Sequence, residues 1–350
     1  MLLMRKLLAV VLWLIFPIVL RGQVETDSLP KHSGAMTLDL TTPAAAPPML
    51  VGWSYAGGIP LPQDPAWTVK LLSVYDEAAR PVVQFRNDQT KVTLSFILFE
   101  NLSGKPTSEG CRQDLMEGLR KSQGELLSNS SSGTLDDGHG GTFATASHFT
   151  RLTSKTHNHD VFAFSGNAKT CAEAHASTIG GSPDEEKNLA AALALFHPDL
   201  SYRPTCAHYL PEANAFYKQA PMTGAPFYDA CLKTIPKDTQ DATQVHDRRL
   251  AVDQIVIALG MAGQVARARH YADDAIKLDP DYPLNYYNLA CADAEEGKAS
   301  AARVHLEQAF ARRQNTLAGE ELPDPEKDDS ILKLKGNTEF WAFVQAIPKS

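Results

Sequence analysis

Histidine is the residue type whose distribution most suggests chemistry in this chain. Five of the eleven histidines lie close together in the sequence: His139, His148, His157, His159 and His175. Residues two apart on a β-strand point to the same side, so His157 and His159 could face one metal ion, and His175 shares a strand face with Cys171 by the same rule. The segment around His157 is polar, however, which favours a solvated turn. Metal binding is therefore the weaker interpretation, with His157, His159 and His175 as its candidate ligands.

Motifs for nucleophilic catalysis or phosphate binding are missing from the sequence. It contains no Gly-x-Ser-x-Gly elbow, and the glycine-rich run at 138–141 lacks the Lys-Ser/Thr of a phosphate loop. The sequence thus names no catalytic residue and no cofactor. A function without catalysis is favoured, and the alternative is a hydrolase or metal-dependent activity in the histidine-rich region.

The five cysteines are too few for a small disulfide scaffold. Cys111 and Cys171 fall in one predicted domain, and Cys206 and Cys231 flank one predicted helical hairpin, which leaves Cys291 over. These two pairings are the candidate disulfides, although spacing alone does not fix the connectivity.

The N-terminus has the pattern of a secretory signal peptide. Arg5 and Lys6 precede an apolar run over 7–20 that is interrupted only by Pro17. A helix of this length spans about 21 Å, short of the roughly 30 Å hydrocarbon core of a bilayer. We therefore expect a signal peptide over 1–22 and an exported protein, periplasmic or secreted, with an uncleaved anchor as the alternative. No further membrane contact is expected, because no long apolar run follows.

Composition and charge limit the classes of partner that this protein could bind. The 350 residues carry 33 basic and 41 acidic side chains, a net charge of −8, and 43% of them are hydrophobic. An acidic chain without a dense basic stripe argues against nucleic-acid binding, which needs several cations on phosphates. The length predicts about two domains.

The first half of the chain is predicted to hold a linker and an α+β domain. Residues 23–66 contain seven prolines between Pro30 and Pro65, which favours an extended proline-rich linker. Residues 67–200 contain short apolar runs, a period-2 alternation over Lys91–Asn101 and two segments with helical patterns. Together they give the order β-β-β-α-β-β-β-α. This order predicts an antiparallel sheet covered by two helices.

The second half, 204–346, is predicted to be all-helical with an internal repeat of 34 residues. Small and apolar residues recur at that spacing: Val252 and Tyr286, Ile255 and Leu289, Gly263 and Gly297, Ala268 and Ala302, Ala272 and Leu306, and Ala275 and Ala309. Glycine allows a turn between antiparallel helices, and alanine lets the two helices approach closely. A helix pair of this kind repeats over about 249–282 and 283–316.

This pattern resembles the tetratricopeptide repeat (TPR), and the segments 279–291 and 319–330 resemble exported bacterial TPR proteins. The resemblance implies an all-α TPR solenoid and a protein-binding scaffold. Residues 204–236 resemble a degenerate further repeat, in which Pro211, Pro221 and Pro226 depart from the pattern, and Asp293 stands where the family usually has an aromatic residue. Residues 328–346 are predicted to form capping helices that seal the last repeat.

The resemblance also implies a groove lined by the first helix of each repeat. The groove positions are Leu250, Asp253, Ile257, Leu284, Tyr287 and Cys291. They are mostly apolar and lack the Lys and Asn that TPR proteins use to clamp a partner's terminal carboxylate. We therefore expect a protein or peptide partner with an apolar segment lying in this groove. Packing of the same residues against the first domain is the alternative.

Overall fold

The computed structural model describes residues 48–348 apart from 54–55, 76–79, 102–103, 124–130, 139–140, 152–156 and 181. The chain divides into two compact units, Met1–Pro204 and Thr205–Ser350. The predicted signal peptide and residues 23–47 of the predicted linker lie outside the described residues. In the described part of the chain, no helix has both the length and the apolar character that crossing a bilayer requires.

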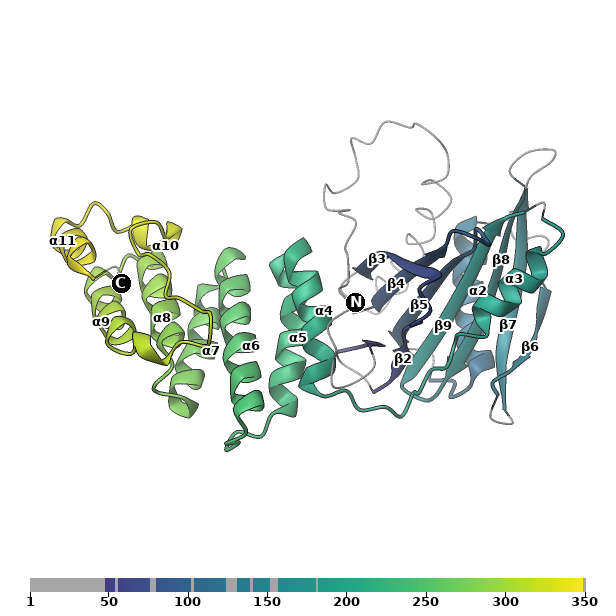
Figure 1. Ribbon diagram of the computed structural model, residues 1–350, viewed down its shortest axis with the longest axis horizontal. Helices are drawn as coiled ribbons and strands as arrows, with labels where there is room; N and C mark the ends of the chain where they lie inside the picture. Colours follow the sequence, from purple (N-terminus) through teal and green to yellow (C-terminus); the bar gives the residue numbers. More distant parts are fainter. Residues whose placement is uncertain are drawn as a thin grey trace. The chain divides into compact units, whose positions relative to one another are not determined.

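The first unit is built on a seven-stranded antiparallel sheet (Figure 1). In sheet order its strands are β3 (Trp67–Tyr75), β4 (Arg80–Asn87), β5 (Thr93–Glu100), β9 (Thr170–Ile179), β8 (His157–Gly166), β7 (Thr142–Arg151) and β6 (Ser131–Asp136). Strands β5 and β9 are neighbours although about 70 residues separate them in sequence. The last strand in the sequence therefore lies at the centre of the sheet.

Two helices cover opposite faces of this sheet, with α3 in front and α2 behind in Figure 1. Helix α2 (Ser108–Gln123) packs through Cys111 and Met116 on Phe162 and Phe164 of β8. Helix α3 (Glu185–Leu193) is followed by Phe196, whose ring lies against Phe96 and Phe143 on the other face. The alternation predicted for the strand at 91–101 is what sorts Phe96 to the α3 face.

The predicted fold class is wrong in the extent of its strands. We expected a six-stranded sheet with two helices, and the first unit instead has the seven-stranded sheet and a separate two-stranded sheet, before eight helices in the second unit. The added strand β6 lies in a segment expected to be a loop. Five of its six residues are exposed, so it carries no hydrophobic alternation to reveal it. Pairing with β7 alone defines this edge strand.

The end of the predicted linker is also folded. Strands β1 (Met49–Val51) and β2 (Gly58–Pro60) pair with each other and pack on β4 and β5. Leu50, Val51 and Ile59 are fully buried there. Prolines are tolerated because they stand at strand ends, where no ladder hydrogen bond is lost. Residues 48–66 thus belong to the first unit instead of a tether.

The second unit consists of helices. They are α4 (Cys206–Gln219), α5 (Pro221–Thr234), α6 (Ala242–Met261), α7 (Val265–Leu278), α8 (Pro283–Glu295), α9 (Ala299–Ala311), α10 (Asp329–Leu332) and α11 (Thr338–Ala346). From α4 to α9 each helix packs on the next, whereas α10 packs on α8 and α11 on α9. Helix α6 also contacts α4 and α8, so the first helices of successive hairpins lie side by side.

The 34-residue spacing is visible in the backbone of the two hairpins α6–α7 and α8–α9. Gly263 and Gly297 end the first helix of each with left-handed φ angles of 69° and 73°. The following residues, Gln264 and Lys298, each donate a backbone hydrogen bond of 2.8 Å to the carbonyl five residues earlier. Both turns therefore have the same helix-ending geometry, which requires a residue that tolerates positive φ.

Gly263 and Gly260 provide a matched test of this turn, because an added Cβ would meet no atom within 4 Å at either position. Gly263→Ala is expected to lower the free energy of unfolding by about 1 kcal/mol, since its φ is left-handed. Gly260→Ala, inside helix α6, should raise it by about 0.5–1 kcal/mol. Urea denaturation of both variants checks the signs, and equal effects would contradict the assigned turn.

Candidate functional site

Four histidines of the first unit lie against two carboxylates. The first is Glu185, which opens helix α3 and whose Oε1 lies 3.0 Å from His157 Nε2 and 2.8 Å from His159 Nδ1. His159 is only 4% exposed, so the expected solvated turn is wrong for this residue. The reason is that α3 brings its carboxylate to the end of β8. A Cβ at Gly180 would collide with both His157 and Glu185, so the arrangement needs glycine there.

The second carboxylate is that of Asp160, which follows His159 on β8 and lies on the opposite face of the sheet. Its oxygens lie 2.8 Å from His175 Nε2 and 3.2 Å from His148 Nε2, and Asn158 Nδ2 donates to it over 2.6 Å. The strand register explains the convergence, because His148 on β7 lies directly opposite Asp160. The ring of Phe162 stacks on His175 at 4.4 Å and on His148 at 5.8 Å.

Burial keeps His148 neutral in this network. Removal from water lowers the pKa of its imidazole, and the nearby charge of Asp160 opposes that shift only in part. Its Nδ1 atom is buried without a hydrogen-bond partner in the described part of the chain. The neutral ring keeps Nε2 3.2 Å from the Asp160 carboxylate, and holding three strands together is the role that this geometry supports.

The three candidate metal ligands do not converge. His157 and His159 meet Glu185 on one face of the sheet, whereas His175 meets Asp160 on the other. Cys171, which shares the face of His175, is joined to Cys111 in a disulfide. Within the described ranges, no three His, Cys, Asp or Glu side chains form a group that could hold a metal ion.

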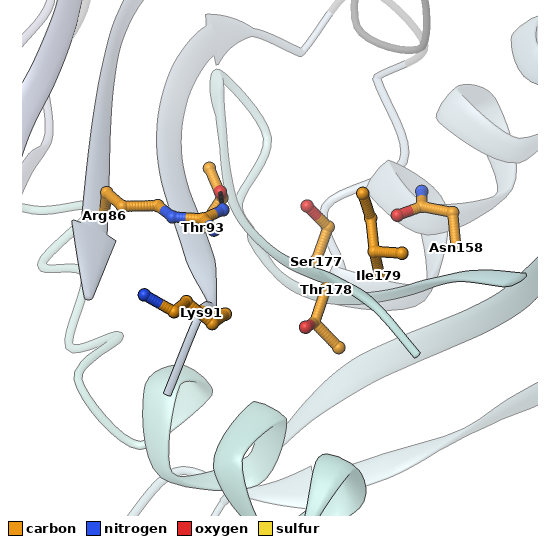
Figure 2. A pocket seen from close by; sticks show the side chains of 7 residues that line it. All are labelled: Arg86, Lys91, Thr93, Asn158, Ser177, Thr178 and Ile179. Atoms are coloured by element: carbon orange, nitrogen blue, oxygen red, sulfur yellow. Dashed lines mark hydrogen bonds between the residues drawn. The ribbon is translucent and has the colours of Figure 1, made fainter. Parts of the chain in front are cut away.

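A small polar cavity lies on the sheet beside Asn158 (Figure 2). Its volume is about 240 Å³, and it is lined by Arg86, Lys91, Thr93, Asn158, Ser177, Thr178 and Ile179. In Figure 2 the side chain of Arg86 reaches across to Thr93, and the bond between Arg86 Nη1 and Thr93 Oγ1 measures 2.9 Å. Asn158, Ser177 and Ile179 form the other side. The lining thus combines two cations with hydroxyl and amide groups.

The groove expected on the second unit is only partly open. Leu250 and Ile257 on α6 and Cys291 on α8 are half-buried. Asp253, Leu284 and Tyr287 are buried, at 8%, 5% and 1% exposure, which corrects their assignment as exposed partner-binding positions. The physical reason is that the chain's own residues 316–334, including α10, pack against helix α8.

This covering segment binds α8 by both apolar and polar contacts. Leu317 and Leu322 pack on the cluster that contains Tyr282 and Tyr287. Tyr282 donates a 2.8 Å hydrogen bond to Glu320 Oε1, whose other oxygen accepts from the backbone N–H of Leu317 at 2.9 Å. Cys291 Sγ lies 3.7 Å from Asp328, and burial together with this carboxylate raises the pKa of the thiol. The cysteine is thus a protonated packing residue.

Asp253 is the polar residue at the centre of the expected groove. It lies between α6 and α8 and accepts a 2.9 Å hydrogen bond from Asn288 Nδ2 and a 3.2 Å bond from Gln254 Nε2. Burial raises the pKa of its carboxyl to about 6 in spite of these donors. The groove therefore carries an acid that is costly to ionise.

Both cysteine pairs considered from the sequence are joined in the structure. Cys111–Cys171 ties α2 to β9 in the first unit, and Cys206–Cys231 ties α4 to α5 in the second. Cys291 is free.

No motif in the sequence marks Asp160, Glu185, Arg86 or Lys91 as a site residue. Side chains alternate along a strand, so the sequence is enough to place Asp160 on the same face as Phe162. The pairing of β7 with β8, which brings His148 to Asp160, cannot be predicted from the sequence. Glu185 had only a weak signal, an acid in the first turn of a helix that begins after Pro183.

Asp160→Asn should test the network that joins β7, β8 and β9. The substitution removes the charge that is hydrogen-bonded to His175 and Asn158 and lies 3.2 Å from His148, and we expect it to lower the free energy of unfolding by about 2–3 kcal/mol. Asp88→Asn is the control, because the Asp88 side chain is 70% exposed and should change stability by less than about 0.5 kcal/mol. Similar denaturation midpoints for the two variants would contradict the network.

Asp253 predicts a stability that falls with rising pH. Its pKa is about 6 in the folded protein against 3.8 for the free side chain, so the folded state binds the proton more tightly. This contribution is complete below about pH 4 and is lost as the pH rises through about 6. Asp253→Asn should be about 1–3 kcal/mol more stable than the parent at pH 7 and nearly equal to it at pH 4. Thermal melts across this range measure the difference, and a constant offset at all pH values would refute the assignment.

Comparison with known proteins leaves the chain without a family assignment. No family model matches it, and no curated protein matches it. Among solved structures, a protein from Bacteroides thetaiotaomicron is 13% identical, with 70% of this chain and 77% of that chain covered and a TM-score of 0.29. A likeness this remote supports no inference about fold or function, so the conclusions below rest on the geometry of the chain itself.

Proposed function

We propose that this protein is an exported protein-binding protein with its helical unit as the binding module. The observation that carries the proposal is the 34-residue repetition of the hairpins α6–α7 and α8–α9. Corresponding residues have the same burial: Ile255 and Leu289 are each 2% exposed, and Ala268 and Ala302 are 2% and 0% exposed. Stacked hairpins of this period resemble TPR arrays, which present one helix of each hairpin along a binding surface.

The disulfides support the exported part of the proposal. Disulfide bonds persist in oxidising compartments and are rare where glutathione keeps thiols reduced. Here each unit contains one, Cys111–Cys171 and Cys206–Cys231. An N-terminal segment with the pattern of a signal peptide agrees with that location.

The binding surface is narrower than the groove expected from the sequence. The chain's own segment 316–334 covers α8, which leaves the face of α6 that carries Leu250 and Ile257. These two residues are a little under two turns apart, so they lie on the same side of the helix. A partner that lays an apolar side chain of a helix or extended segment between them fits this face.

Ile257→Glu tests the proposal in the organism that makes the protein. Tagged protein is crosslinked in the native host, and the crosslinked proteins are quantified by mass spectrometry. A charge at this half-buried position should reduce recovery of the true partner about tenfold or more, because burying an unpaired carboxylate opposes apolar contact.

Val304→Glu is the matched control, since Val304 on α9 is 49% exposed and lies outside the proposed face. It should leave recovery unchanged. Circular dichroism and thermal melts of both variants establish that they are folded. If every crosslinked protein is recovered equally with both variants, α6 is not the binding surface.

A further inference from the structure

We propose that the cavity lined by Arg86, Lys91, Thr93 and Ser177 binds a tetrahedral oxyanion, the phosphate or sulfate group of a small molecule. The site lies in the first unit and is independent of the protein-binding surface proposed for the helices. Three features of the cavity support this: the charge of its lining, the strand pairing that holds the lining in place, and the backbone conformation of Lys91.

The lining is cationic and rich in donors. Arg86 and Lys91 are its charged residues, and none of the seven residues that line it is acidic. The acid nearest to Arg86 among the described residues is Asp88, 3.9 Å from Nε, with a side chain 70% exposed. Such a long and solvated ion pair neutralises little of the guanidinium charge. An oxyanion would pair with the planar guanidinium through two parallel hydrogen bonds.

The sheet holds the donors in one row. Arg86 on β4 lies opposite Thr93 on β5, and Thr93 lies opposite Ser177 on β9. Side chains at directly opposite positions are on the same face, about 5 Å apart. The hydrogen bond from Arg86 Nη1 to the Thr93 hydroxyl fixes the guanidinium in this row. A site on three paired strands is rigid before the ligand arrives, which lowers the entropy cost of binding.

Lys91 has a backbone that its side chain does not favour. Its φ is 62°, the only positive value outside glycine among the described residues. It closes the turn between β4 and β5, in which Asn87 Oδ1 accepts from the N–H groups of Gln89 and Thr90. Glycine or asparagine would adopt this conformation with less strain. A lysine that keeps the strain at the edge of the cavity is a typical feature of a binding residue.

The carboxylate of Asp160 is not among the groups that line the cavity. It lies on the next strand, opposite Ser177, but already accepts hydrogen bonds from Asn158 Nδ2 and His175 Nε2. Asn158 lines the cavity and stands between the cavity and this carboxylate in the hydrogen-bond network. The volume of about 240 Å³ is enough for a phosphate group and a small substituent.

Isothermal titration calorimetry with inorganic phosphate tests the proposal on the full chain, with sodium chloride holding the ionic strength constant. We expect saturable binding that Arg86→Gln and Lys91→Asn each weaken about tenfold or more. Arg303→Gln is the matched control, because Arg303 is similarly exposed and lies in the other unit. It should bind phosphate as the parent does. Lys91→Asn should also raise the melting temperature by a few degrees, about 2–4 °C, because asparagine relieves the backbone strain.

Two further ligands decide which group is recognised. Sulfate should compete with phosphate, since both are tetrahedral, and acetate should bind much more weakly. The proposal is overturned by an absence of saturable phosphate binding, by equal losses in Arg86→Gln and Arg303→Gln, or by acetate binding as tightly as phosphate.

Discussion

Within each unit, buried carboxylates hold neighbouring helices and strands together. Asp160 joins β7, β8 and β9, and Glu185 joins α3 to β8. In the helical unit Asp253 joins α6 to α8, and Asp293 on α8 accepts from Arg269 on α7 and His305 on α9, at 2.6 Å each. An ionised carboxylate away from water is stable only when donors surround it. Each acid therefore fixes the relative position of two or three elements, and apolar packing fills the space between them.

Asp293 shows what this constraint does to a repeat. Its carboxylate forms an ion pair with Arg269 on α7 and contacts His305 on α9, so it fixes the position of α8 against both helices. Helix α8 buries eleven of its thirteen residues. Helices α7 and α9 cover part of its surface, and the chain's own residues 316–334 cover a further part and close that part of the groove.

Local patterns predicted those elements whose own residues define them. The alternation over 91–101 locates β5, and Gly263 and Gly297 mark the two repeated turns. Strands that are defined only by pairing with another strand were not predicted. Strand β6 is exposed on both faces, and β1 and β2 stand among prolines, so neither has a period of its own. The carboxylate networks were not predicted for the same reason. Glu185 and His159 are 26 residues apart, and only the packing of α3 on β8 brings them together.

The departures from local rules separate structural sites from candidate binding sites. Asp160 and Asp293 break the rule against buried charge, but donors from neighbouring elements compensate each of them. Lys91 and Asp253 are different. Lys91 keeps a left-handed backbone, and Asp253 keeps a carboxyl whose pKa burial raises to about 6 in spite of the hydrogen bonds that it accepts. In a sequence whose local and global preferences otherwise agree, such costs concentrate where function requires them. Lys91 lies at the cationic cavity, and Asp253 lies on α6 between the half-buried Leu250 and Ile257, which makes the cavity and this face of α6 the places where ligands should be sought.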